Sequence, residues 1–257
     1  MTRPAISADL QTWDVGIARV PLCILRRTTG PAGPPVLLLH GFNSTPPQAK
    51  DKEASSLAAA GFTVLAVEAP HHGARRSPLV DAVIEAQGPP AHELFLRIVR
   101  ESVAELPAVV DRALQEHGGP LGVVGISMGA YTALAAAAVE PRLAVVVSIL
   151  GSPDWAPREG EPTATNRAWL TEAPMHHPGR FPPRALLLAN AGRDVNVPPA
   201  ASRAFAAKLR PRYAAHPERL DYREYPESEH FMREDDWSDL WSRTLEWLSR
   251  YLATPAA

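Results

Sequence analysis

The sequence predicts an α/β fold, in which helices cover both faces of a mostly parallel central sheet. Short apolar runs of strand length alternate with longer stretches whose apolar residues recur at helical spacing. A length of 257 residues fits one large domain or two small ones. Because the alternation continues without a linker or an internal repeat, we expect a single domain over residues 1–257.

The expected strands begin with an antiparallel start and continue as a parallel series. An alternating pattern predicts one or two early strands over residues 10–28. Runs of Val, Ile and Leu are typical of parallel strands that are buried on both faces. Such runs occur at 34–42, 62–70, 121–126, 143–150 and 184–192, and an alternating final strand is expected at 220–226.

Helices are expected between these strands. They span residues 50–61, 94–114, 198–209 and 235–252, and one more runs from the end of the 121–126 strand to about residue 140. Pro107 is expected to kink or divide the helix over 94–114, because proline removes a backbone hydrogen bond. A Gly/Pro-rich loop is expected up to about residue 91. The last helix carries a stripe expected to pack against the sheet, formed by Trp237, Leu240, Trp241, Leu245, Leu248 and Tyr251.

Charge and composition exclude several classes of protein. The net charge is −2 and no run of like charges occurs, so we expect neither nucleic acid nor an anionic membrane surface as a partner. Residues 121–139 are uncharged over a span that could cross a membrane, but Val and Ile give way there to Ala, with glycines at the change. A buried strand followed by a buried helix explains that pattern better. The first ten residues lack the apolar core of a signal peptide, and we expect a soluble, cytoplasmic monomer or homodimer.

The lone cysteine carries little information about function. Cys23 cannot form an intrachain disulfide, and it lies in an apolar stretch with the alternation of a strand. We expect it to be a buried core thiol.

One serine stands between two glycines where a β-branched run becomes alanine-rich, in the stretch "GVVGISMGAYTALAAAA". A serine hydroxyl acts as a nucleophile when it is presented beside a base, and one solution is a sharp turn from a strand into a helix with the serine at its tip. Side chains two residues before and after that serine would collide, and here both positions are glycine, Gly125 and Gly129. An ordinary turn is the alternative, but the predicted strand–turn–helix context favours Ser127 as a nucleophile.

Together with this motif, three stretches resemble a known family. They are "HGFNS" (40–44), "APHHGAR" (69–75) and "AHELFLRIVRESV" (91–103). The chain resembles the α/β-hydrolase fold over nearly its whole length, and within it small bacterial carboxylesterases of the dienelactone-hydrolase and prolyl-oligopeptidase-like branch. Dienelactone hydrolases carry a cysteine nucleophile where this chain has Ser127, so the resemblance implies the chemistry of serine esterases. The chain has no room for the propeller of a prolyl oligopeptidase.

The fold that this resemblance implies places a nucleophile, an acid and a histidine in that chain order. Asp194 follows the predicted strand 184–192 closely, where the family has its acid, although a turn or helix-cap role is the usual one for such an aspartate. His230 lies 36 residues further, in the loop before the last helix, and it alone of nine histidines fits the expected place. Glu227 is the next candidate for the acid, ahead of Glu229 and Asp221.

The loop after the strand 34–42 normally supplies the other half of such a site. We expect the backbone N–H groups of Phe42 and Met128 to form the oxyanion hole. His40 is expected to be a structural hydrogen-bonding residue under this loop. Asn43 is a candidate for the substrate pocket.

The segment 153–183 is expected to form a small cap between the strands 143–150 and 184–192. Its seven prolines stiffen it, and residues 165–171 allow at most one short helix. Its large apolar residues are Trp155, Trp169, Met175 and Phe181. We expect at least two of them to fasten the cap to the body, and Trp155, Trp169 and Met175 are the candidates for a compact acyl pocket.

No cofactor or metal ion is expected. The histidine pairs 71–72 and 176–177 are adjacent in sequence, and neighbours seldom face one metal ion from the same element. No HExxH or CxxC spacing occurs. Arg75 and Arg76 could anchor a substrate carboxylate, although surface exposure is the simpler expectation for at least one of them.

The sequence therefore predicts a serine hydrolase that cleaves short-chain carboxylic esters through Ser127, His230 and Asp194 and an acyl-enzyme intermediate. A thioesterase, an acyltransferase or an amidase on the same site is the nearest alternative. A non-catalytic binding protein with this fold is a further one, which usually requires that one of the three positions is lost.

Overall fold

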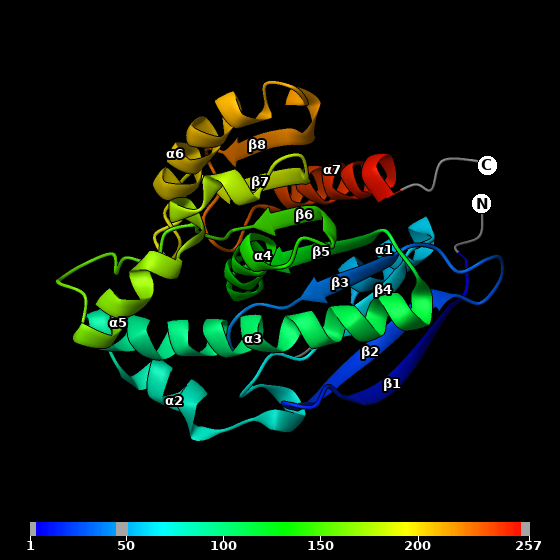
Figure 1. Cartoon of the computed structure of the whole chain (residues 1–257), viewed down its shortest axis with the longest axis horizontal. Helices are drawn as coiled ribbons and strands as arrows, with labels where there is room; N and C mark the ends of the chain where they lie inside the picture. Colours follow the sequence, from blue (N-terminus) through cyan, green and yellow to red (C-terminus); the bar gives the residue numbers. More distant parts are fainter. Residues whose placement is uncertain (1–3, 45–50, 253–257) are drawn as a thin grey trace.

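Eight strands form one sheet in the computed structural model, which describes residues 4–44 and 51–252 (Figure 1). Their order across the sheet is β1-β2-β4-β3-β5-β6-β7-β8. The strands are β1 (Ile6–Asp14), β2 (Arg19–Arg27), β3 (Pro35–Leu39), β4 (Thr63–Val67), β5 (Leu121–Ile126), β6 (Leu143–Ile149), β7 (Ala185–Ala191) and β8 (Leu220–Tyr225). Only the pairs β1–β2 and β2–β4 are antiparallel, so the predicted mostly parallel sheet is confirmed.

The strand sequences explain their places in the sheet. Every residue of β3, β4 and β7 is buried, as expected for strands that are covered on both faces. The edge strand β1 alternates polar and apolar residues and is mostly exposed. Cys23 lies buried and unpaired on β2, as predicted.

Helices cover both faces of the sheet. They are α1 (Lys52–Ala60), α2 (Pro78–Glu85), α3 (Gly88–His117), α4 (Met128–Val139), α5 (Ala164–Trp169), α6 (Ala200–Leu209) and α7 (Glu234–Leu252). One core cluster lies between the sheet and helices α3, α4 and α6, and a second lies between the sheet and helices α1 and α7. The predicted stripe of α7 packs in the second cluster, with Leu240, Trp241 and Leu248 buried.

Two expectations about the segment after β4 are wrong. The expected loop contains α2, which begins at Pro78. The hydroxyl of the preceding residue, Ser77, caps this helix by accepting a hydrogen bond from the amide of Leu79. Proline at the first helical position behind a serine cap starts a helix and does not break it. The helix α3 begins at Gly88, earlier than predicted, and runs for 30 residues with Pro107 inside it.

Pro107 does not divide α3 because the residues around it are held by the core. Leu106, Val109 and Val110 are buried in the cluster beneath the helix. Proline removes one backbone hydrogen bond, and the packing on either side of it keeps the helix continuous.

The segment 153–183 lies at the carboxyl ends of the parallel strands. In Figure 1 the arrowheads point left, toward the side where α2 and α5 lie. The segment contains α5 and three short 3₁₀ helices, at Leu170–Glu172, Pro174–His176 and Pro178–Arg180. The predicted single short helix is thus present. Across residues 4–44 and 51–252, no helix has the length and hydropathy that a membrane crossing needs.

Candidate active site

Ser127 occupies the turn between β5 and α4, and its backbone is strained. Its φ of 53° and ψ of −115° place a non-glycine residue in the left-handed half of conformational space. Such a conformation costs about 1–3 kcal/mol and persists only where the surrounding structure imposes it. Residues held in this way cluster at functional sites.

The two flanking glycines are required by close backbone contacts. A Cβ atom on Gly125 would lie 2.1 Å from the carbonyl oxygen of Gly129. A Cβ atom on Gly129 would lie 2.2 Å from the carbonyl oxygen of Leu39, at the end of β3. Gly129 therefore leaves room for the end of β3, a requirement that the spacing of the two glycines around Ser127 does not reveal.

The structure brings Ser127, His230 and Asp194 into one hydrogen-bonded chain. His230 Nε2 lies 3.1 Å from Ser127 Oγ, and His230 Nδ1 lies 2.7 Å from Asp194 Oδ2. Because a carboxylate only accepts hydrogen bonds, Nδ1 carries the proton and Nε2 is left to accept the serine hydroxyl. A base thus faces a hydroxyl, and an acid orients the base.

Asp194 is held more firmly than an ordinary turn residue. It follows β7, and its side chain is 0% exposed. Its Oδ1 accepts the amides of Asn196 and Val197, each at 2.8 Å, which leaves Oδ2 for the imidazole. The rival acid Glu227 forms an ion pair with Arg193 on the surface instead.

The loop after β3 passes beside Ser127. A Cβ atom on Gly41 would lie 3.6 Å from Ser127 Cβ, and Phe42 is the next residue of that loop. Met128 is the first residue of α4, and the first amides of a helix have no acceptor within it. Phe42 and Met128 therefore lie on two different segments of the chain that both border Ser127.

His40 fastens this loop from below. Its Nδ1 lies 2.8 Å from the carbonyl oxygen of Gly41, and its Nε2 accepts the amide of Ala69 at 3.1 Å. Burial lowers the pKa of His40 to about 4, so the ring is neutral near pH 7. His40 has the structural hydrogen bonds that the sequence led us to expect.

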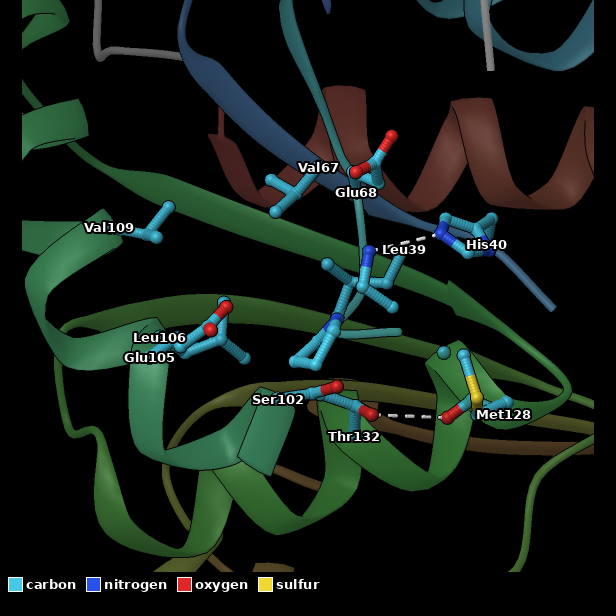
Figure 2. A pocket seen from close by; sticks show the side chains of 13 residues that line it. Leu39, His40, Val67, Glu68, Ser102, Glu105, Leu106, Val109, Met128 and Thr132 are labelled. Atoms are coloured by element: carbon cyan, nitrogen blue, oxygen red, sulfur yellow. Dashed lines mark hydrogen bonds between the residues drawn. The ribbon is translucent and has the colours of Figure 1, made fainter. Parts of the chain in front are cut away.

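A small cavity lies beneath the same loop, between the ends of β3 and β4 and the helices α3 and α4. Figure 2 shows that His40, Glu68, Glu105 and Met128 are among the residues around it. Its volume is about 20 Å³, which is enough for one water molecule. Ser127 does not line this cavity.

An apolar cluster lies next to Met128. Phe95 contacts Tyr131 and Phe42 edge-on, with ring centroids 5.2 and 6.1 Å apart. Trp155 is 2% exposed and belongs to the same cluster. Helices α2, α3 and α4 and the segment 153–183 all contribute to it.

The structure separates the expected pocket residues. Trp155 and Trp169 both line a groove of about 670 Å³ between α3 and the segment 153–183. Met175 packs against the core cluster under α3, α4 and α6, and Phe181 is buried there against Phe205. Met175 therefore fastens the segment to the body, and its expected role in the substrate pocket stays a prediction.

Asn43, in the loop after β3, and Arg76, in the segment after β4, both lie on the surface. The Asn43 carboxamide is exposed, and its oxygen lies 3.4 Å from Arg76 Nη1. Arg76 also forms an ion pair with Asp81. Arg75 instead donates to Glu105 at 2.8 Å, so its guanidinium is engaged within the protein.

The described part of the chain (4–44 and 51–252) contains no group of three or more His, Cys, Asp or Glu residues placed to hold a metal ion. The adjacent histidines 71 and 72 have different partners. His71 contacts Ser77 and Glu101, whereas His72 contacts the backbone of Pro70 and Asn43.

His72 also lies at this site, which is not predicted from the sequence. Its Nε2 accepts the amide of Asn43, next to Phe42. The available signal was its position shortly after β4, which is adjacent to β3 in the sheet. The loops after two neighbouring parallel strands meet at one edge of the sheet.

Comparisons with known proteins agree with this geometry. Residues 36–256 match the model of the alpha/beta hydrolase family. The chain is 28% identical over 246 residues to a protein of Bacillus subtilis (strain 168) named "Putative esterase YitV", covering 86% of this chain and 90% of that protein.

Solved structures show the same fold. TT1662 from Thermus thermophilus has a TM-score of 0.74 at 22% identity, covering 96% of this chain and 99% of that one. A cold-adapted esterase from an Arctic intertidal metagenomic library has a TM-score of 0.68 at 18% identity, covering 96% and 95%.

Proposed function

The chain belongs to the alpha/beta hydrolase family, and from this premise we propose that it is a serine hydrolase that cleaves carboxylic esters. The observation that carries the proposal is the hydrogen-bonded chain from Ser127 through His230 to Asp194. The similarity to a protein named as an esterase supports the same substrate class.

In the proposed mechanism, His230 Nε2 removes the proton of the Ser127 hydroxyl as its oxygen attacks the ester carbonyl. Asp194 keeps the imidazole in the tautomer with its proton on Nδ1 and stabilises the imidazolium that forms. The imidazolium then gives its proton to the leaving alcohol, and an acyl-enzyme remains. Water, deprotonated by the same imidazole, hydrolyses the acyl-enzyme and restores Ser127.

The amides of Phe42 and Met128 are the proposed oxyanion hole. Negative charge develops on the former carbonyl oxygen in the tetrahedral intermediate. Two fixed N–H donors stabilise that charge without reorganisation, and losing one donor typically costs about 3 kcal/mol of the barrier. The start of α4 adds the positive end of a helix dipole.

We also propose that residues 153–183 act as a small cap on one hydrolase domain and favour short acyl groups. Its only α-helix has six residues, and Met175 and Phe181 fasten it to the body. A cap this short has little room to enclose a long acyl chain. Acetyl to butyryl esters are therefore the proposed substrates.

Turnover of p-nitrophenyl butyrate, with matched thioester and anilide substrates, tests this proposal. We expect the ester to give the highest kcat/KM, and Ser127→Ala and His230→Ala each to abolish turnover. Ser242→Ala, an exposed serine on α7, is the matched control and should leave the rates unchanged. Higher kcat/KM for the thioester or the anilide would assign the site to a thioesterase or an amidase.

Two further alternatives give different outcomes. An acyltransferase would deliver the butyryl group to an added alcohol faster than to water. A protein that only binds ligands would show no turnover that depends on Ser127. Because all three positions hold suitable residues in hydrogen-bond contact, we favour the enzyme.

A further inference from the structure

Two histidines join the loop after β3 to the loop after β4 in a reciprocal way. His40, from the first loop, accepts the amide of Ala69 in the second loop at 3.1 Å. His72, from the second loop, accepts the amide of Asn43 in the first loop at 3.1 Å. Their ring centroids lie 5.1 Å apart, with the rings edge to face.

The hydrogen bonds define the tautomer of both rings. His40 Nδ1 lies 2.8 Å from the carbonyl oxygen of Gly41, and His72 Nδ1 lies 2.8 Å from that of Pro70. Because a carbonyl oxygen only accepts, each Nδ1 carries the proton and each Nε2 is a free acceptor. Burial lowers the pKa of both imidazoles, which keeps them neutral and able to accept.

The loop after β4 is itself fixed to α3. His71 Nε2 lies 2.6 Å from Glu101 Oε2, and Arg75 Nη1 donates to Glu105 at 2.8 Å. His72 lies between these two anchors in the sequence. The backbone that carries His72 is therefore anchored to α3 on both sides.

From this arrangement we propose that His72 is a positioning residue, which holds the Phe42 amide in place for the oxyanion by binding the amide of Asn43. The inference rests on the proposed function. Asn43 has a left-handed φ of 53°, so the peptide that follows Phe42 turns sharply and needs an anchor. The Phe42 ring also packs edge-on against His72, with centroids 5.7 Å apart.

Without the His72 acceptor, the Asn43 amide would hydrogen-bond to water instead. The loop would then no longer hold the Phe42 amide in one position beside Ser127. A misplacement of about 1 Å in a catalytic group can reduce a rate about a hundredfold. The loss should fall on kcat, since the amide binds the oxyanion more strongly than the neutral carbonyl.

Two substitutions of His72 separate its acceptor from its donor. In His72→Gln, the side-chain oxygen can occupy the place of Nε2 and accept the Asn43 amide. In His72→Asn, the shorter amide can still donate to Pro70 from the place of Nδ1, but nothing reaches Asn43. The exposed His216, changed to Asn, is the control for replacing a histidine.

We expect His72→Asn to lower kcat by about tenfold to a hundredfold with KM nearly unchanged, and His72→Gln to restore most of it. The inhibition constant of a boronic acid, which places an oxygen in the oxyanion hole, should rise in His72→Asn by the same factor. Wild-type kcat in His72→Asn, or an equal loss in both variants, would overturn the proposal.

Amide hydrogen exchange at Asn43, followed by NMR, supplies a readout that does not depend on turnover. Exchange should be faster in His72→Asn than in the wild type and in His72→Gln. Unchanged exchange would overturn the role of His72 while leaving the proposed function intact. A wild type without turnover that depends on Ser127 would contradict the proposed function instead.

Discussion

Asp194 holds His230 with one carboxylate oxygen while two backbone amides occupy the other. Oδ2 lies 2.7 Å from His230 Nδ1, and Oδ1 accepts the amides of Asn196 and Val197 at 2.8 Å. The carboxylate therefore has one orientation, and so has the imidazole that it holds. This relationship distinguishes Asp194 from an aspartate that merely caps a turn.

Replacing Asp194 by Asn should preserve the fold and remove most of the activity. The amide would still accept the two backbone bonds through its oxygen, but its NH₂ group would face Nδ1 and force the wrong tautomer on His230. We expect kcat to fall by about 10⁴-fold. Steady-state kinetics beside Glu227→Gln checks this, since that control should stay near the wild-type rate. A near-wild-type kcat in Asp194→Asn together with a large loss in Glu227→Gln would assign the role of the acid to Glu227.

Replacing Gly125 by Ala should destabilise the protein. The new Cβ would lie 2.1 Å from the Gly129 carbonyl oxygen, so the backbone of the turn must move. We expect a loss of about 3 kcal/mol in the free energy of unfolding. Gly41→Ala is the control, because its Cβ would meet Ser127 Cβ at 3.6 Å, an ordinary contact. Equal stability of both variants in urea titrations would refute the contact argument.

The buried His40 should make the fold less stable in acid. Burial lowers its pKa from 6.5 to about 4, so in that interval the unfolded chain binds more protons at this residue than the folded chain. Its stabilising effect is complete above pH 6.5 and is lost as the pH falls toward 4, by about 3 kcal/mol in all.

Urea unfolding at pH values on both sides of that interval measures this effect. His40→Gln cannot titrate there, so its free energy of unfolding should fall less with decreasing pH than that of the wild type. Parallel pH dependences of the two proteins would show that His40 does not contribute.

Acyl-chain length should affect kcat/KM gradually. Each methylene group that fits adds at most about 0.8 kcal/mol of binding, and one that does not fit costs packing. We expect a maximum between acetyl and butyryl p-nitrophenyl esters and a decline for longer chains. A maximum at octanoyl or beyond would mean that the segment 153–183 opens onto a channel for lipid chains.

Much of the sheet could be predicted because its signals are local. Five-residue strands such as β3 and β4 are continuous apolar runs between turn residues. The turn at Ser127 can be recognised in the sequence because close backbone contacts require a glycine two residues before and two residues after the serine. The relation of Asp194 and His230 to that turn followed from the chain order of the family.

What the sequence could not give depends on contacts between distant segments. Pro107 lies inside α3 because packing against the core keeps that helix continuous, whereas Pro78 starts α2 behind the Ser77 cap. Met175 is apolar like Trp155, but only tertiary structure shows that they enter different clusters. The proposed role of His72 depends on its hydrogen bond with the Asn43 amide, 29 residues earlier in the chain.

Covalent labelling with a fluorophosphonate tests most directly whether Ser127 is an activated nucleophile. The reagent phosphonylates a serine whose hydroxyl is deprotonated by a neighbouring base, and mass spectrometry locates the adduct. We predict one adduct per folded chain, on Ser127, that is absent in Ser127→Ala and strongly slowed in His230→Ala. A folded wild-type protein that remains unlabelled at Ser127 would contradict the proposed function.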